Sequence, residues 1–197
     1  AIPDAAGRQD VQMALLSHCE NLRDRFAIFD APQGLPPTGP GSIRDWVAAL
    51  RSDRGYGALY YPWVLVSHPA GGTVAVPPSG HVAGVYARSD GERGVNKAPA
   101  NFPLNSALGV VTLINDDTQG PLNIDGVNVL RVFPGQARPV VWGARTTSPQ
   151  TAWQYVNIRR LLLFIEESIE EGIRWAVFEP HNPALCAKLR RTILDFL

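Results

Sequence analysis

The stretch PVVWGARTTSPQTAWQYVNIRRLLLFIEESIEEGIRWAVFEP, residues 139–180, decides the fold. Its apolar pattern predicts a strand, a turn, a long helix and a second strand at 173–179. The helix carries its charges in blocks, with Arg159-Arg160 near its middle and Glu166-Glu167 and Glu170-Glu171 at its end. Carboxylates at the C-terminal end of a helix are disfavoured by the helix dipole. We therefore expect this acidic end to attract cations from its own subunit or from a neighbour, as an assembly surface does.

Strand and helix patterns alternate upstream of this stretch, which favours a parallel, layered α/β arrangement. The helix at 9–24 is expected to bury a stripe that contains Val11, Leu15 and Leu22 with His18 or Cys19. The other expected elements are a strand at 25–30, a Pro/Gly loop, a helix that begins after Ser42, a strand at 57–66 with Pro62 at an irregular or edge position, and a helix from Ser79.

The second half of the chain has weaker patterns. LGVVTLIN, residues 108–115, is a strand candidate, and Asp125-Gly126 fits the two-residue turn of a β-hairpin. Pro134-Gly135 then turns the chain into the strand at 137–146, and a final helix runs from about 183 to the end.

Several long motifs resemble, in family order, the tail sheath proteins of contractile phages and related contractile injection systems. They are DVQMALLSHCE with RFAIFDAP (10–32), PPSGHVAGVYARSDGERGVNKAPAN (77–101), QGPLNIDGVNVLRVFPG (119–135), VWGART (141–146), YVNIRRLLLFIEESIEEG (155–172) and RWAVFEP (174–180). The resemblance implies a layered sheet with helices on both faces, in a subtilisin-like topology without an active site, over residues 1–146. It implies that 147–197 begin the C-terminal sheath domain, an α+β segment.

The same resemblance implies a structural protein that polymerises into a helical sleeve around a rigid tube and shortens to drive the tube through a target envelope. Its implied partners are other copies of itself, the inner tail tube protein and the baseplate, without nucleic acid, cofactor or membrane insertion. Its implied place is the virion tail or an injection particle, assembled in the bacterial cytoplasm. Typical subunits extend beyond both Ala1 and Leu197, so we expect a core fragment without the exchanged terminal arms.

The composition agrees with a structural role. The 18 basic and 18 acidic residues give a net charge of zero, so no overall field attracts nucleic acid or an anionic membrane. The longest apolar runs, such as 161–165, are too short to span a bilayer. Cys19 and Cys186 lie in helical patterns, where we expect each to be a small buried residue of a protein made in a reducing compartment.

An enzyme is the alternative, as an inactive or divergent subtilisin-like hydrolase. Subtilases carry a nucleophilic serine five residues before a His-Val-Ala-Gly motif, and here that motif is 81–84, which places Val76 in the nucleophile position. Asp30 loosely resembles the subtilase aspartate, but no His-Gly-Thr motif occurs. Acyl transfer needs a nucleophile, a base and an orienting acid together, so we expect no catalysis.

The remaining polar residues suggest surfaces rather than sites. The four histidines are expected to be structural or exposed, and Glu166 with Glu170 lacks a histidine at i+3 that would favour a metal site. Arg88, Arg93 and Lys97 form a basic cluster for which we favour an acidic partner surface over a phosphate. The subunit-interface candidates are Arg88, Arg93, Lys97, Arg159, Arg160, Glu166, Glu167, Glu170 and Glu171.

The last helix leaves two interpretations open. Lys188, Arg190 and Arg191 lie opposite an apolar set of leucine and isoleucine side chains at 185, 189, 193 and 194. These three cations are candidates for contact with the inner tube, and a solvated helix surface explains them equally well.

Overall fold

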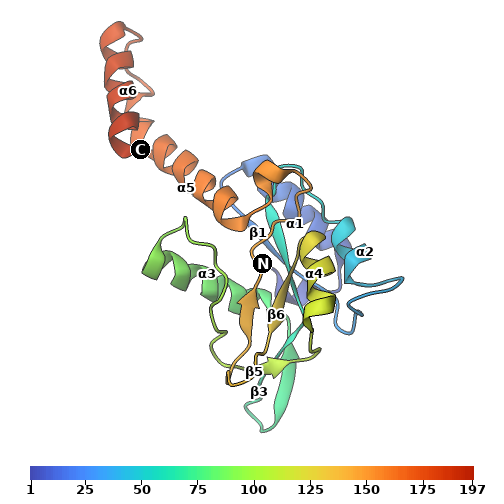
Figure 1. Ribbon diagram of the computed structural model, residues 1–197. Helices are drawn as coiled ribbons and strands as arrows, with labels where there is room; N and C mark the ends of the chain where they lie inside the picture. Colours follow the sequence, from blue (N-terminus) through green and yellow to red (C-terminus); the bar gives the residue numbers. More distant parts are fainter.

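A four-stranded sheet in the order β1-β2-β6-β7 lies at the centre of the computed structural model, which describes residues 1–197 (Figure 1). Its strands are β1 (Ala27–Asp30), β2 (Gly57–Tyr61), β6 (Val127–Arg131) and β7 (Val140–Trp142). The first three are parallel and β7 is antiparallel to β6. The predicted parallel, layered α/β arrangement is therefore confirmed for the centre of the molecule.

A smaller antiparallel sheet continues from the central one. It consists of β3 (Val64–Ser67), β4 (Thr73–Val76) and β5 (Ala107–Val110), in the order β4-β3-β5. The sequence predicts one strand at 57–66, but β2 and β3 are separate strands in different sheets, and a cis peptide bond joins Tyr61 to Pro62 between them. Proline lacks the amide hydrogen that a continuous ladder requires, so the strand is interrupted here.

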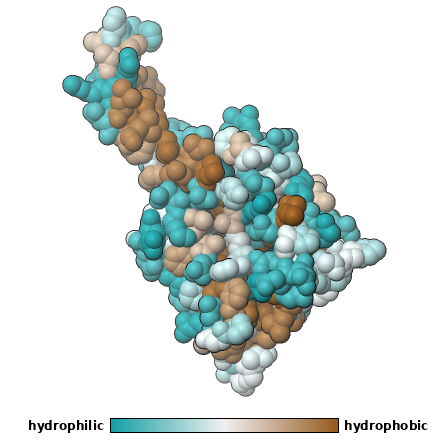
Figure 2. Space-filling view, in the orientation of Figure 1, coloured by the Kyte–Doolittle hydropathy of each residue, from teal (hydrophilic) through white to brown (hydrophobic).

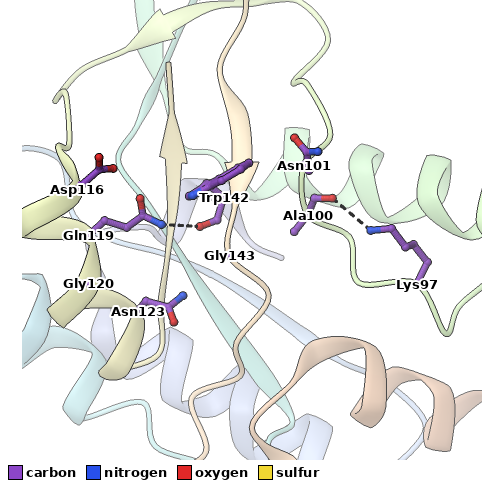
Figure 3. Close-up of a pocket in the computed structure, with 9 residues that line it drawn as sticks. All are labelled: Lys97, Ala100, Asn101, Asp116, Gln119, Gly120, Asn123, Trp142 and Gly143. Atoms are coloured by element: carbon purple, nitrogen blue, oxygen red, sulfur yellow. Dashed lines mark hydrogen bonds between the residues drawn. The ribbon is translucent and has the colours of Figure 1, made fainter. Parts of the chain in front are cut away.

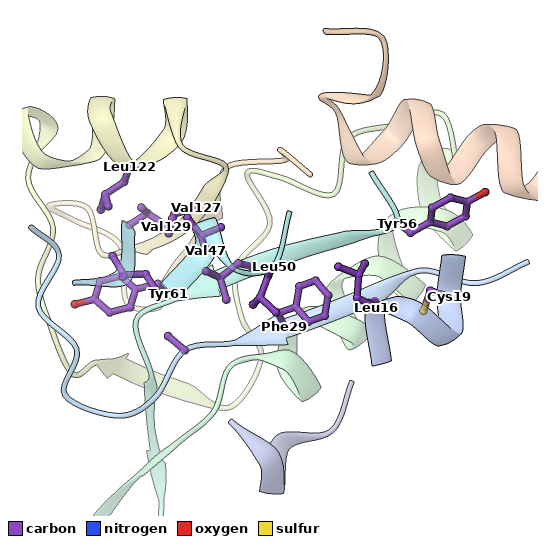
Figure 4. Close-up of a cluster of buried hydrophobic side chains, with 14 of the residues drawn as sticks. Leu16, Cys19, Phe29, Val47, Leu50, Tyr56, Tyr61, Leu122, Val127 and Val129 are labelled. Atoms are coloured by element: carbon purple, nitrogen blue, oxygen red, sulfur yellow. The ribbon is translucent and has the colours of Figure 1, made fainter. Parts of the chain in front are cut away.

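Helices cover both faces of the central sheet. On one face, α1 (Gln9–Leu22), α2 (Ile43–Ala48) and α4 (Asp116–Ile124) enclose one hydrophobic cluster (Figure 4). On the other, α3 (Ser79–Arg93) packs with the small sheet around a second cluster. Alternate strand residues divide between the two: Phe29 and Leu59 join the first, Ile28 and Tyr60 the second. This alternation is the period-2 geometry of a strand buried on both sides.

The buried stripe of α1 differs by one position from the prediction. Gln12, Leu16 and Cys19 face the core, whereas Leu22 is about half exposed. Gln12 is buried because its amide Nε2 donates to the carbonyl oxygen of Asp30 at 2.8 Å and to that of Ala6 at 2.9 Å. A polar residue with paired hydrogen bonds can occupy a core position that a hydrophobicity pattern assigns to its neighbours.

The predicted hairpin at Asp125-Gly126 is wrong, because α4 leads into β6, which pairs in parallel with β2. Asn115 caps α4 by accepting from the Thr118 amide at 3.0 Å. Gly126 follows the helix with φ at 87°. A glycine with positive φ ends a helix as readily as it serves a hairpin turn. The predicted strand at 108–115 is shorter in the structure. The strand β5 ends at Val110, because the chain then leaves the sheet to reach the start of α4 at Asp116.

The predicted strand at 173–179 is also wrong. After α5 (Val156–Ile173), residues 174–176 form a 3₁₀ helix, η3, and the chain then turns to α6 (Pro183–Phe196). Phe178 in this segment is 98% exposed. A strand needs a neighbouring ladder, and none lies beside this segment, which stands away from both sheets (Figure 1). The expected α+β character of 147–197 is thus absent, since the regular elements of this part are helices.

Two further features are the covering of the β7 edge and the direction in which the last helices leave the sheet. The free edge of β7 is covered by residues 101–104, whose amides and carbonyls bond to residues 139–141 at 2.7–3.0 Å. Beyond β7, α5 leaves the body and carries α6 at its tip (Figure 1). We call α5, η3 and α6 the arm, and residues 1–155 the body.

Gly126 offers a test of the helix-to-strand connection. A Cβ at this position would lie 2.8 Å from the carbonyl oxygen of Thr146, in addition to the strain of positive φ. Gly135 has a similar φ of 79° but open space around it. We expect Gly135→Ala to lose about 1–2 kcal/mol of stability from backbone strain alone, and Gly126→Ala to lose clearly more, in urea denaturation. Equal losses would contradict the close approach of Gly126 to Thr146.

Candidate functional site

Asp30 lies at the end of β1, where the resemblance to subtilases places an aspartate. Its side chain is buried, and Oδ1 accepts a hydrogen bond from the backbone amide of Ser79 at 2.8 Å. Burial raises the pKa of Asp30 to about 6, against the opposing effect of its contact with Ser79. A carboxylate at the first residue of α3 stabilises the helix N-terminus. The contacts of Asp30 therefore assign it a structural use.

Val76, in the nucleophile position of the resemblance, is the last residue of β4. His81 lies in the first turns of α3, and burial lowers its pKa. Of the other histidines, His18 contacts Arg25 at 3.2 Å and His68 accepts from the Ala70 amide, both on the surface. No group of three or more His, Cys, Asp or Glu side chains is arranged to hold a metal ion.

The base of the arm is fixed to the body through Arg159, which the sequence suggested as an interface residue. Its side chain is 2% exposed, and its guanidinium lies 3.9 Å from the ring centre of Trp153 and 4.6 Å from that of Tyr56. Nε donates to the carbonyl oxygen of Arg54 at 2.8 Å. Arg159 is held inside the subunit, where its hydrogen bond and its cation–π contacts compensate for the free-energy cost of burying its charge. It is therefore unavailable to a neighbouring subunit.

Arg160 forms the second contact between arm and body. Its guanidinium makes a two-pronged ion pair with the Asp90 carboxylate on α3, at 2.9 and 2.5 Å, and lies over the ring of Tyr86. The Tyr86 hydroxyl in turn pairs with that of Tyr60 at 2.7 Å in the core. Paired bonds of this kind fix orientation as well as distance. The direction of α5 thus follows from the position of α3.

The acidic end of α5 is nearly unpaired. Among Glu166, Glu167, Glu170 and Glu171, only Glu171 reaches a cation, Arg174, at 3.9 Å and on an exposed surface. Exposed pairs of this length contribute little. Glu167 is half-buried against the body, whereas Glu166 and Glu170 face solvent. The four carboxylates therefore divide into two sides of the helix.

The basic cluster is brought together only in part. Arg88 and Lys97 both lie over the ring of Phe102, at 5.4 and 5.6 Å from its centre, and both donate to backbone carbonyls. Arg93, at the end of α3, is exposed and separate from them. Arg88 and Lys97 thus have partners in the chain, and Arg93 is the member of the cluster that remains free.

The α6 helix has no buried residue. Its apolar positions 185, 189 and 193 are half-buried, but Leu194 is 59% exposed. Lys188 lies 4.0 Å from the ring centre of Trp175, while Arg190 and Arg191 make no ion pair within the chain. Cys186 is exposed, contrary to the expectation of a buried thiol, whereas Cys19 is buried as predicted.

A shallow hollow of about 700 Å³ beside β7 was not anticipated from the sequence (Figure 3). Its lining is mostly polar, with Trp142 as its aromatic side chain. The polar groups largely serve each other: Gln119 donates to the carbonyl oxygen of Trp142 at 3.4 Å, and Lys97 points to the carbonyl oxygen of Ala100. Trp142 itself packs edge-on against Phe133. None of these groups has the arrangement of a nucleophile with a base.

No helix has the length and apolar character needed to cross a lipid bilayer.

Comparison with known families decides the identity of the fold. The sequence model of the phage tail sheath protein central domain matches residues 2–147. The chain belongs to the phage tail sheath protein family. Among individual proteins, a prophage major tail sheath protein of Pseudomonas aeruginosa (strain UCBPP-PA14) is 27% identical over 182 residues. This alignment covers 89% of this chain and 45% of the relative.

Solved structures extend the similarity of this sheath family member to the arm. A chain of the anti-feeding prophage baseplate is 33% identical, with a TM-score of 0.81. The alignment covers 96% of this chain and 48% of the baseplate chain. A chain of the anti-feeding prophage helical sheath in its contracted state is 34% identical, with a TM-score of 0.77 and coverage of 96% and 49%. The contracted sheath complex of an extracellular contractile injection system, PVC, gives 36% identity, a TM-score of 0.75, and coverage of 87% and 47%.

The chain therefore spans about half the length of the relatives that it matches. These relatives are sheath proteins of prophages and components of contractile injection systems, as the quoted motifs predicted.

Asp30 gives a prediction about pH. Its folded-state pKa of about 6 lies above the ordinary value of 3.8, so the folded protein holds this proton more tightly than the unfolded chain does. The contribution is complete below pH 4 and is lost as the pH rises through 6, a change of about 3 kcal/mol for a shift of about two units. We expect the stability of the wild type to fall by this amount relative to Asp30→Asn between pH 4 and pH 7. Parallel pH profiles of the two proteins in urea denaturation would contradict the assignment.

The ion pair between Arg160 and Asp90 gives a second prediction. A double-mutant cycle with Arg160→Ala, Asp90→Ala and the double variant should yield a coupling free energy of about 1–2 kcal/mol. This exceeds the value of a fully exposed pair because both side chains are mostly covered, with 16% and 26% of their surfaces exposed. A cycle with Arg8 and Asp10, which are paired on an exposed surface, is the matched control and should yield a clearly smaller coupling free energy, because solvent screens exposed charges.

Proposed function

We propose that this chain is part of a structural subunit that polymerises around a rigid tube and shortens to drive that tube through a target cell envelope. The observation that carries the proposal is the similarity to a helical sheath in its contracted state, which extends over 96% of the chain at 34% identity. A protein with this role must keep its fold while its contacts with neighbours change. The two buried clusters and the double anchor of α5 support such a rigid body.

The proposed organisation has two parts. Residues 1–146 form a subtilisin-like domain, and 147–197 begin the C-terminal sheath domain. Thr146 and Thr147 are buried, and the Thr147 amide donates to the Gly57 carbonyl at 2.9 Å. The boundary is thus a packed connection, which supports transmission of force between the two parts rather than free swinging.

We propose that the chain catalyses no reaction and needs no cofactor. Val76 supplies no nucleophilic atom, and the Asp30 carboxylate is engaged with the start of α3. The proposed partners are copies of the same chain, the inner tube and the baseplate, in a virion tail or injection particle assembled in the host cytoplasm. The matches to sheath and baseplate assemblies support this set of partners.

Within this role, the free charges of the arm and of the end of α3 are the proposed contacts. The acidic end of α5 and the exposed Arg93 are candidates for contacts between subunits, whereas Arg159 is excluded by its burial. Lys188, Arg190 and Arg191 of α6 are candidates for the tube, although Lys188 already contacts Trp175. Many weak, salt-sensitive contacts suit a polymer that changes its lattice.

A charge reversal tests the proposed role. In the full-length protein, produced together with its tube protein, we expect Glu167→Lys with Glu171→Lys to reduce the fraction of sheathed tubes in electron micrographs several-fold, because like charges now face the partner surface. Circular dichroism should be unchanged, since these side chains lie outside the core. Tubes that never acquire a sheath with the wild-type protein would contradict the function itself.

A further inference from the structure

A groove of about 520 Å³ lies in the angle where the arm leaves the body. It is lined by α3, by α5 and by the segment that precedes β1. Phe26, Leu163 and Phe164 provide an apolar surface, and Phe164 is 51% exposed. An open groove with an exposed aromatic side chain is a surface that another molecule can cover favourably.

The charged groups around this groove leave a negative excess. Asp24 is paired with Arg25, and Asp90 is paired with Arg160. The other two carboxylates are Glu167 and Glu171, one helical turn apart on α5. Glu171 reaches Arg174 at 3.9 Å, and Glu167 has no ion pair, although Arg25, which is paired with Asp24, lines the same groove. A segment that fits this groove must therefore combine apolar side chains with at least two cations.

The α6 helix offers that combination. Arg190 and Arg191 precede Leu194 by four and three residues, so all three share one region of the helix surface. These residues, with Cys186, Ala187 and Asp195, border an open depression. Figure 2 shows apolar residues exposed along the arm, whose outer part stands clear of the body. Because Arg190 and Arg191 have no ion pair in their own chain, their charges are available to another molecule.

We propose that α6 of one copy docks in the groove of a second copy, with Arg190 and Arg191 opposite Glu167 and Glu171 and with Leu194 against Phe164. This inference deepens the proposed sheath role and rests on it. The groove and α6 are different surfaces of the same chain, so the contact is head-to-tail. A head-to-tail contact that does not close into a ring generates a helical polymer, which is the symmetry of a sheath.

Other cations of the chain fit less well. Arg88 and Lys97 are held at Phe102 and by backbone carbonyls, and Arg93 is a single charge without a neighbouring apolar side chain that is exposed. Only α6 unites adjacent arginines with an exposed leucine on a helix that projects from the body.

A charge swap tests this docking. One variant reverses the groove (Glu167→Lys with Glu171→Lys) and the other reverses α6 (Arg190→Glu with Arg191→Glu). In sedimentation velocity at low ionic strength, the 197-residue wild type should associate, and each variant alone should associate at least about tenfold more weakly. An equal mixture of the two should recover association to within about threefold of the wild type, since each groove then meets a complementary α6.

The matched control reverses Glu166 and Glu170, which lie on the same helix with the same spacing but outside the groove. It should associate as the wild type does. Circular dichroism of every variant checks the fold. A monomeric wild type, a mixture that stays dissociated, or a control as weak as the groove variant would each overturn the docking.

Binding to purified tube protein distinguishes the docking from the sheath role. If Arg190→Glu with Arg191→Glu abolishes tube binding and leaves self-association intact, α6 serves the tube and the docking is wrong. If the full-length groove and α6 variants still build sheaths, the docking is wrong while the proposed function stands. If the full-length wild type associates through the groove but never sheathes a tube, the docking stands and the proposed function fails.

Discussion

The burial of Arg159 under Tyr56 and Trp153 is the contact on which the shape of the molecule depends. A charged side chain is costly to bury, so its aromatic neighbours and its bond to the Arg54 carbonyl must stay in place. Arg160 adds an ion pair to α3 one residue later. Two adjacent arginines thus fix the first turns of α5 to both sides of the central sheet. The direction of the exposed part of the arm follows from these two contacts.

This constraint separates the chain into residues that hold the fold and residues that remain free for partners. Arg159, Arg160, Arg88 and Lys97 have close contacts within the subunit. The acidic end of α5 has one long, exposed ion pair, and Arg190 and Arg191 of α6 have none. Similar residue types in neighbouring positions therefore have opposite uses.

The sequence predicted the elements whose signals are local and missed those that depend on distant partners. Helical periodicity located α1, α3, α5 and α6, and the buried strand expected at 25–30 followed from its apolar run. Asp125-Gly126 was misassigned because a glycine with positive φ suits both a hairpin and a helix end, and only the parallel pairing with β2 decides between them. The burial of Arg159 was missed because it depends on contacts with Trp153 and with Tyr56, and the fold brings Tyr56 to it from a distant part of the sequence. The acidic end of α5 was recognised as unusual, but its division into two sides required the position of α3.

The strip of residues 101–104 along β7 limits how copies of the chain can pair when they are packed closely. An open strand edge is a template for indiscriminate ladder formation between chains, which is difficult to reverse. With that edge occupied by its own backbone, the central sheet cannot fuse with its neighbours there. Crowded copies can then slide past one another through side chains and separate again without forming fibrils at this edge.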